Sequence, residues 1–220
     1  MTKKGDTLIE VTLAVGIFSM VAIAVVAVMS NGTSNTQTAL ETTLARAEID
    51  AQAEALRFIQ ASAAAESSND AKFSTLWQTI TNSEPNSGLV HVVSDSDGSY
   101  QFAPQTCTEL YEDGKIKDQK AFFINIDGLN SYLESSTANP APTPIVTADG
   151  SFSTTETYPR VNDGKAEGIY IVARRDNTKI ITTNGAYYPY DFYIHACWNS
   201  SNSDHASTIS TVIRLLGKAL

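Results

Sequence analysis

Apolar side chains form one unbroken run near the start of the chain, over residues 8–29. The run contains one ionisable residue, Glu10, and its other polar side chains are Thr12 and Ser19. A helix of this length would measure about 33 Å at ~1.5 Å per residue, which matches a hydrocarbon core of about 30 Å. The pattern therefore predicts a transmembrane helix over residues 6–30.

A second helical pattern follows a polar stretch at residues 31–35, where Gly32 predicts a bend or a locally unwound turn. Strong helix formers return over residues 36–66. Apolar residues recur there at spacings of three and four, which predicts one apolar helix face: Leu40, Leu44, Ala47, Ala51, Ala55 and Phe58. We expect residues 31–66 to continue the membrane helix outward and to pack this face on a globular domain formed by residues 67–220.

The remaining residues alternate short apolar runs with Gly, Asn, Asp and Ser, which is typical of strands and turns. A short helix is predicted over residues 70–81, with Asn69 or Asp70 as its N-cap. One helical turn is expected within residues 127–133. Strands are expected at residues 89–93, 99–102, 121–126, 168–174 and 179–183, and an antiparallel hairpin from residues 190–198 and 208–216. These elements predict an α+β fold, with a long N-terminal helix packed on a C-terminal antiparallel sheet.

The charged residues predict the orientation of the chain in the membrane and argue against one class of partner. Lys3 and Lys4 precede the apolar run and no basic residue follows it until Arg46, so the positive-inside rule places the N-terminus in the cytoplasm. The 24 acidic and 15 basic residues give a net charge of -9, which argues against a nucleic-acid partner. A secretory signal peptide cleaved near residues 27–32 is the alternative, although its apolar region would be shorter.

The sequence contains two cysteines, Cys107 and Cys197, which do not form a CxxC pair. A zinc site is therefore not expected. If the C-terminal part lies outside the cytoplasm, a Cys107–Cys197 disulfide is expected, worth roughly 4.5 kcal/mol in the chain-entropy picture. Two separate buried thiols are the alternative.

No catalytic or cofactor-binding constellation is recognisable in the sequence. The histidines His91, His195 and His205 have no neighbours that complete a triad or a metal-binding spacing. A Ser-Asp-Ser-Asp-Gly-Ser stretch that contains Asp95 and Asp97 resembles the start of a calcium loop but lacks the distal glutamate. We expect a protein that is not an enzyme and has no cofactor, with Asp95 and Asp97 as a minor calcium candidate.

The residues before and around Glu10 resemble a known processing signal. The stretch KKGDTLIEV, residues 3–11, places a short basic leader, a glycine and Thr-Leu-Ile-Glu directly before the predicted membrane span. In this order the residues resemble the processing site of type IV prepilins and pseudopilins. The sequence departs from the family at Asp6, where the family has an apolar residue, usually phenylalanine.

The resemblance implies that a prepilin peptidase removes residues 1–5 by cutting between Gly5 and Asp6, and that N-methylation would fall on the new amine of Asp6. Glu10 would then be the fifth mature residue, which in the family pairs with the N-terminal amine of a neighbouring subunit and sets the register of assembly. This role agrees with physics, because a charge at membrane depth is tolerated only when it is paired. The implied partners are the peptidase, the membrane and other pilin subunits, contacted through the N-terminal helix.

The implied function is structural. The chain would leave the cytoplasmic membrane for an extracellular or periplasmic filament. Its length and Asp6 favour a minor pilin or a pseudopilin over the abundant major subunit, and a minor pilin of a type IV pilus is the expectation adopted here. A pseudopilin of a type II secretion system is one alternative. A single-pass membrane-anchored binding or adhesion protein that does not polymerise is another.

Overall fold

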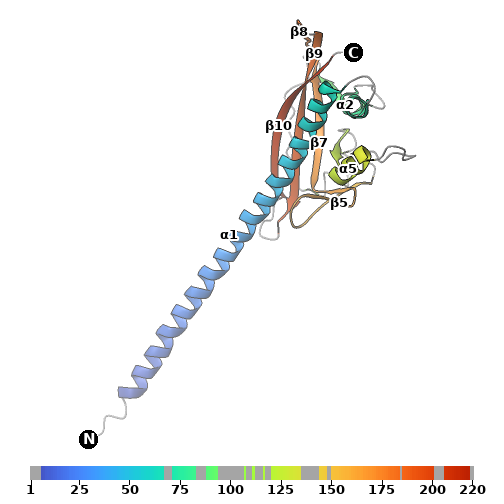
Figure 1. Ribbon diagram of the computed structural model, residues 1–220. Coiled ribbons are helices and arrows are strands. Elements are labelled where there is room, and N and C mark those ends of the chain that lie inside the picture. The colour runs from blue at the N-terminus through green and yellow to red at the C-terminus, as the bar shows by residue number, and fades with distance from the viewer. Residues whose placement is uncertain are drawn as a thin grey trace. The chain divides into compact units, whose positions relative to one another are not determined.

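The computed structural model has an α+β layout in which a long N-terminal helix precedes a largely antiparallel sheet (Figure 1). It describes residues 6–66, 71–82, 88–93, 107, 111, 116, 120–134, 144–147, 150–183, 185–200 and 206–218. The chain forms two compact units, Met1–Glu41 and Thr42–Leu220. The predicted α+β layout, with a long apolar N-terminal helix and a C-terminal antiparallel sheet, is confirmed.

The helix α1 (Asp6–Ala65) contains 60 residues and is helical throughout residues 31–35. The predicted bend at Gly32 was therefore wrong. One glycine costs a helix only about 1 kcal/mol relative to alanine, and α1 continues for several turns on either side of Gly32. The hydroxyls of Thr33 and Thr36 donate hydrogen bonds to the carbonyls of Met29 and Gly32, so both hydroxyls are satisfied within the helix.

The main sheet contains seven strands in the order β10-β9-β7-β2-β3, with β1 paired to β7 and β8 paired to β9. All of its pairings are antiparallel except β1 with β7. Its strands are β1 (Val90–Val93), β2 (Phe122–Ile124), β3 (Ile145–Thr147), β7 (Ile169–Asp176), β8 (Ile180–Thr182), β9 (Gly185–Asn199) and β10 (Ala206–Lys218). A second, three-stranded sheet is formed by β4 (Phe152–Ser153), β5 (Arg160–Asn162) and β6 (Lys165–Glu167).

The predicted hairpin is confirmed, because β9 pairs antiparallel with β10 along thirteen residues of each strand, 187–199 and 206–218. The predicted strands at residues 89–93, 121–126, 168–174 and 179–183 correspond to β1, β2, β7 and β8. The strand predicted at residues 99–102 lies outside the described residues. The sequence did not indicate β3, β4, β5 or β6, which have two or three residues each and are too short to show an alternating pattern.

Two short helices accompany the sheet, α2 (Lys72–Thr81) and α5 (Ile126–Glu134). The helix α5 is longer than the single turn that was expected. The N-cap of α2 is Ala71, which makes no capping hydrogen bond, so the prediction of Asn69 or Asp70 was wrong. The carboxylate of Glu66, just beyond the end of α1, instead accepts hydrogen bonds from backbone amides in the first turn of α2.

The second unit has its main core between one face of the sheet and the C-terminal part of α1. That part of α1 contributes five buried side chains: Ala45, Ile49, Ala53, Leu56 and Ile59. The predicted apolar face was wrong, because Leu40 and Phe58 are 57% and 51% exposed. The true face lies one residue further along, a rotation of about 100°. It includes the buried Gln52, whose polarity hid the pattern.

The opposite face of the sheet carries a smaller core. Ile116 and Ala121 are buried there against Tyr170 and Val172 of β7. Since β7 is covered on both faces, its residues from 169 to 173 form a continuous buried run. The sheet is therefore the middle layer of the second unit.

Candidate functional site

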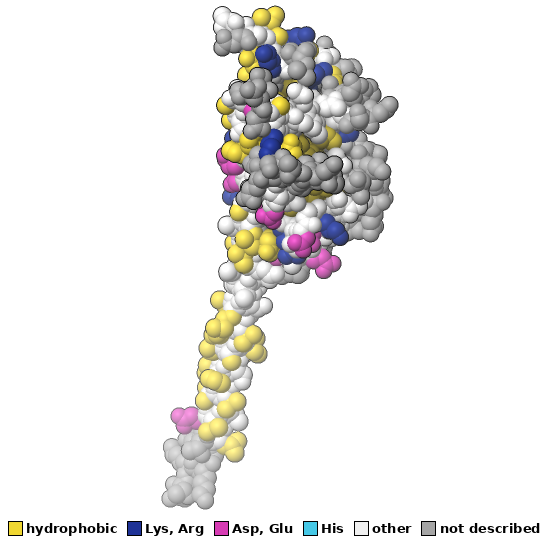
Figure 2. Space-filling model, turned by 45° about the vertical axis from the view of Figure 1, so that its right-hand side comes forward, with side chains coloured by type: hydrophobic (Ala, Val, Ile, Leu, Met, Phe, Trp, Pro, Cys, Tyr) yellow, Lys and Arg dark blue, Asp and Glu magenta, His cyan; other side chains and the backbone are white. Residues whose placement is uncertain are grey.

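The N-terminal segment of α1 is a candidate membrane anchor. It is long and apolar enough to cross a membrane, with a mean hydropathy of 2.7 in its most apolar window, and none of that window is buried. Large apolar side chains such as Phe18, Met20 and Val28 are more than two-thirds exposed. Hydrophobic side chains also line the visible face of this segment in Figure 2. In water such a surface would be unfavourable, so the segment suits a lipid or protein environment.

The polar side chains of this segment fall into two groups. The hydroxyls of Thr12 and Ser19 donate hydrogen bonds to the carbonyls of Ile9 and Val15, at 2.9 and 2.7 Å, which lets them lie among lipid tails. Glu10 is the one ionisable residue among residues 8–29, and its side chain is exposed. A carboxylate placed at depth in a membrane is costly unless it is paired with a positive charge.

The proposed cleavage site lies at the border of the described residues. Gly5 is outside them. Asp6 is the first residue of α1, and only its backbone is described. The calcium candidates Asp95 and Asp97 also lie outside the described residues. Within the described part of the chain, no group of three or more His, Cys, Asp or Glu side chains is arranged to hold a metal ion.

Cys107 and Cys197 form a disulfide with a Cα–Cα distance of 5.7 Å. Both residues are fully buried, and the bond closes a sequence separation of 90 residues. It attaches the segment that contains Cys107 to β9. Beside it, Gly168 has a φ of 70°, and a Cβ at that position would collide with the Cys197 carbonyl, so glycine is required.

His195 lies on β9, two residues before Cys197, and is 2% exposed. Its ring is 5.1 Å from that of Tyr170 and 6.3 Å from that of Tyr193, measured between centroids. Burial lowers the pKa of His195 from 6.5 to about 4. The imidazole is therefore neutral at physiological pH and belongs to the packing of the sheet. His91 lies on β1, and His205 is outside the described residues.

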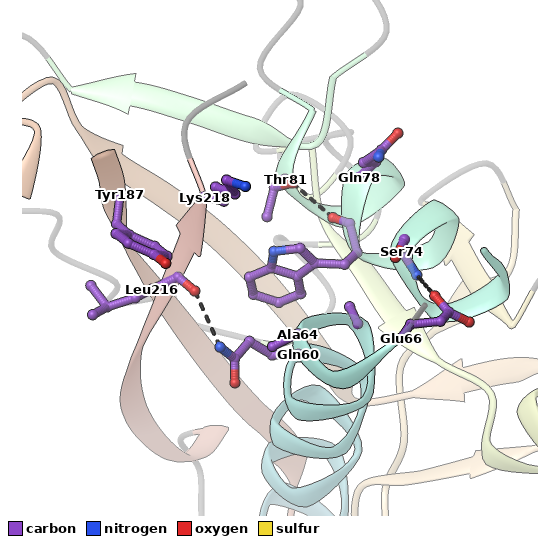
Figure 3. Close-up of a pocket in the computed structure, with 11 residues that line it drawn as sticks. Gln60, Ala64, Glu66, Ser74, Gln78, Thr81, Tyr187, Leu216 and Lys218 are labelled. Carbon is purple, nitrogen blue, oxygen red and sulfur yellow. Dashed lines mark hydrogen bonds between the residues drawn. The ribbon is translucent and has the colours of Figure 1, made fainter. Parts of the chain in front are cut away.

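A cavity of about 410 Å³ lies where the end of α1, α2 and the strands β9 and β10 meet (Figure 3). Amide, hydroxyl and aromatic groups dominate its wall, including Gln60, Trp77, Gln78 and Tyr187. The Nε2 atom of Gln60 donates a hydrogen bond of 3.2 Å to the carbonyl of Leu216 in β10. The wall of the cavity therefore includes the backbone of β10 as well as side chains.

Two charged residues line this cavity, Glu66 and Lys218. The Glu66 carboxylate accepts hydrogen bonds from the backbone amides of Phe73 and Ser74, at 3.0 and 2.7 Å. Partial desolvation raises the pKa of Glu66, but these hydrogen bonds outweigh it, and the pKa lies below its ordinary value. Since the carboxylate serves the first turn of α2, the wall suits binding of polar, uncharged groups more than acid–base chemistry.

Sequence reasoning did not find this cavity, because its residues come from four elements and share no local motif. No protein-family model, curated protein or solved structure matches the chain.

Proposed function

We propose that this chain is a structural subunit of a type IV pilus-like filament, a minor pilin that is made as a prepilin. The observation that carries the proposal is the order of residues 3–11, with two lysines, glycine and Thr-Leu-Ile-Glu, directly before a helical segment whose apolar surface is exposed. Each part alone is common. Together they resemble the prepilin processing site and supply a helix that needs other molecules around it.

In the proposed pathway, a peptidase cuts between Gly5 and Asp6 and the mature chain remains in the membrane until assembly. Glu10 then pairs with the N-terminal amine of a neighbouring subunit. This pairing supplies the positive partner that a carboxylate inside an apolar segment requires. The apolar surface of residues 8–29 passes from lipid into contact with other N-terminal helices.

The second unit supports a filament role because its core is built on the same helix. α1 is continuous from the candidate anchor to Ala65, and five of its side chains between Ala45 and Ile59 are buried in the main core. A disulfide and a second small core add stability that suits a domain outside the cell. The apolar run of 22 residues also exceeds the 7–15 residues of a secretory signal peptide.

The test replaces Glu10 by alanine in cells that carry the native filament system. We expect Glu10→Ala to accumulate in the membrane at the normal level but to fall at least tenfold in sheared filaments. Glu54→Ala is the matched control, because Glu54 lies on the same helix, is exposed and pairs locally with Arg57. Normal recovery of Glu10→Ala in filaments would refute the proposal.

Two alternatives have different consequences. A pseudopilin would be required for protein secretion and not for surface pili, which deletion of the gene would reveal. A membrane-anchored binding protein would be indifferent to Glu10→Ala and would be missing from sheared filaments altogether.

A further inference from the structure

The cavity between α1, α2, β9 and β10 has the size of a small-ligand site. Its volume of about 410 Å³ falls within the ~300–1,000 Å³ that such sites occupy. All of its lining residues belong to the second unit, Thr42–Leu220. Figure 3 shows Tyr187 and Lys218 on the side of the strands and Ser74 and Gln78 on the side of α2. A ligand in this space therefore contacts groups from separate elements at once.

Several groups of the wall are held in place by the fold itself. The ring of Trp77 packs on the core, with its centroid 6.2 Å from that of Tyr190 and 6.0 Å from that of Phe192. Gly217 makes room for this packing, because a Cβ there would collide with the Tyr190 ring. The Gln60 amide is held by its hydrogen bond to β10. A wall that is already ordered loses little entropy when a ligand binds.

The wall has unused capacity for hydrogen bonds. Within the described part of the chain, the Gln78 amide and the Trp77 indole N–H make no hydrogen bond, and the Lys218 ammonium makes no ion pair. The Gln60 amide donates through Nε2, which leaves its Oε1 atom available as an acceptor. Donors and acceptors therefore lie together in one wall. Hydroxyl groups are suitable partners for such a wall, because each donates one hydrogen bond and accepts others.

The charges of the wall favour a neutral ligand. Glu66 and Lys218 have opposite signs, so the wall has no net charge. The Glu66 carboxylate already accepts hydrogen bonds from the backbone amides of α2, which makes it a poor partner for a cation. A single lysine on a chain with a net charge of -9 does not make a site for phosphate or another strongly charged anion.

The same wall also offers apolar surface. The rings of Trp77 and Tyr187 line it, together with the methyl groups of Ala63 and Ala64. Aromatic rings contribute a large apolar surface and, in Trp and Tyr, a polar group at the edge. The matching ligand has flat apolar faces and hydroxyl groups around its rim. A pyranose sugar has this combination, because its C–H groups lie on the ring faces and its hydroxyls project at the edge.

We propose that this cavity binds a neutral mono- or disaccharide. The sugar hydroxyls bond to Gln60, Gln78 and Lys218, and a face of the sugar ring packs on an aromatic ring of the wall. The proposal goes beyond the filament function and does not depend on it, because no lining residue belongs to the candidate anchor.

The test uses the full chain in micelles of dodecylphosphocholine, a detergent without a sugar headgroup. The probes are lactose, maltose, cellobiose and N,N′-diacetylchitobiose, and binding is measured by saturation-transfer NMR and tryptophan fluorescence. We expect at least one probe to bind saturably, with a Kd of about 1 mM or lower. Trp198 is buried and Trp77 is the other tryptophan of the chain, so Trp77→Phe should abolish the fluorescence change. Sorbitol, an open-chain polyol without ring faces, should give no signal.

The decisive variant is Gln78→Ala. Gln78 is exposed on α2 and alanine is the best helix former, so this change should leave the fold intact. We expect at least a threefold loss of affinity for the probe that binds, and at least a tenfold loss when Lys218→Ala is added. Thr79→Ala is the matched control, because Thr79 is exposed on the same helix, bonds to the Thr75 carbonyl and does not line the cavity. Its affinity should equal that of the original chain.

Four results would overturn the proposal. The first is no saturable binding of any of the probes to the original chain. The second is equal affinity for the original chain and the double variant of Gln78 and Lys218. The third is an equal response to sorbitol. The fourth is binding of sodium glucuronate without binding of any neutral sugar, which would assign the cavity to an anion held by Lys218.

Discussion

Gln52 of α1 and the backbone of Ile124 in β2 exchange two hydrogen bonds, each 2.9 Å long. The amide Nε2 donates to the Ile124 carbonyl and the Oε1 atom accepts from the Ile124 N–H. Both residues are fully buried. The pair joins the helix to the inner part of the sheet, and it satisfies backbone groups that would otherwise have no bond inside the core.

Replacement of Gln52 by alanine should be severely destabilising. It would leave the Ile124 N–H and carbonyl buried without their partner, at about 1–3 kcal/mol for each group. We expect a loss of about 3 kcal/mol in the free energy of unfolding, measured by urea titration in detergent with tryptophan fluorescence. Gln60→Ala is the control, because it removes one exposed hydrogen bond and should cost about 1 kcal/mol or less. Equal costs for the two variants would contradict this view of the core.

The sequence pattern places Phe58 on the buried face of α1, whereas the structure places Leu56 there. Leu56→Ala should therefore lower the free energy of unfolding more than Phe58→Ala does. Leu56→Ala removes a fully buried side chain and should cost about 3 kcal/mol. Phe58→Ala removes a half-exposed ring whose contact with Phe73 is edge-on at 5.4 Å, and should cost about 1 kcal/mol. The same urea titration measures both, and a larger cost for Phe58→Ala would show that the face is assigned wrongly.

The disulfide should be a major source of stability in the second unit. Replacement of both Cys107 and Cys197 by alanine is expected to lower the free energy of unfolding by roughly 4.5 kcal/mol, because the unfolded chain loses a constraint on a long loop. A reducing agent should destabilise the original chain by a similar amount and leave the double variant unaffected. A double variant within about 1 kcal/mol of the original chain would disagree with this prediction.

Stability should fall as the pH falls from about 6.5 towards 4. Burial lowers the pKa of His195 to about 4, so in this window the unfolded chain binds a proton that the folded chain does not. Between pH 7 and pH 5 the loss due to this residue should be about 2 kcal/mol. In His195→Phe, which keeps an aromatic ring beside Tyr170 and Tyr193, the loss over this pH range should shrink by that amount. An unchanged pH dependence would exclude His195 as its source.

The sequence predicts the elements with long, regular patterns and misses features that depend on tertiary contacts. The apolar run of residues 8–29 and the β-formers of β9 and β10 are strong local signals. The face of α1 was misjudged because Gln52 looks like a surface residue until Ile124 is placed beside it. The capping of α2 by Glu66 was missed for the same reason, since Phe73 and Ser74 lie seven and eight residues away.

The candidate sites likewise divide into those that the sequence alone identifies and those that depend on the tertiary structure. Glu10 and the cysteines can be identified from residue type and spacing alone. The cavity cannot, because its wall depends on how α1, α2, β9 and β10 meet. A single sequence shows that α2 is a helix but not that its Trp77 lies beside Tyr190 of β9.

The most direct test of the proposed function is the N-terminal sequence and intact mass of the protein from its native membrane, with and without an active prepilin peptidase. We predict a chain that begins at Asp6 when the peptidase is active and at Met1 or Thr2 when it is absent. A chain that begins at Met1 or Thr2 in both cases would contradict the pilin assignment, and the membrane-anchored binding protein would become the better explanation.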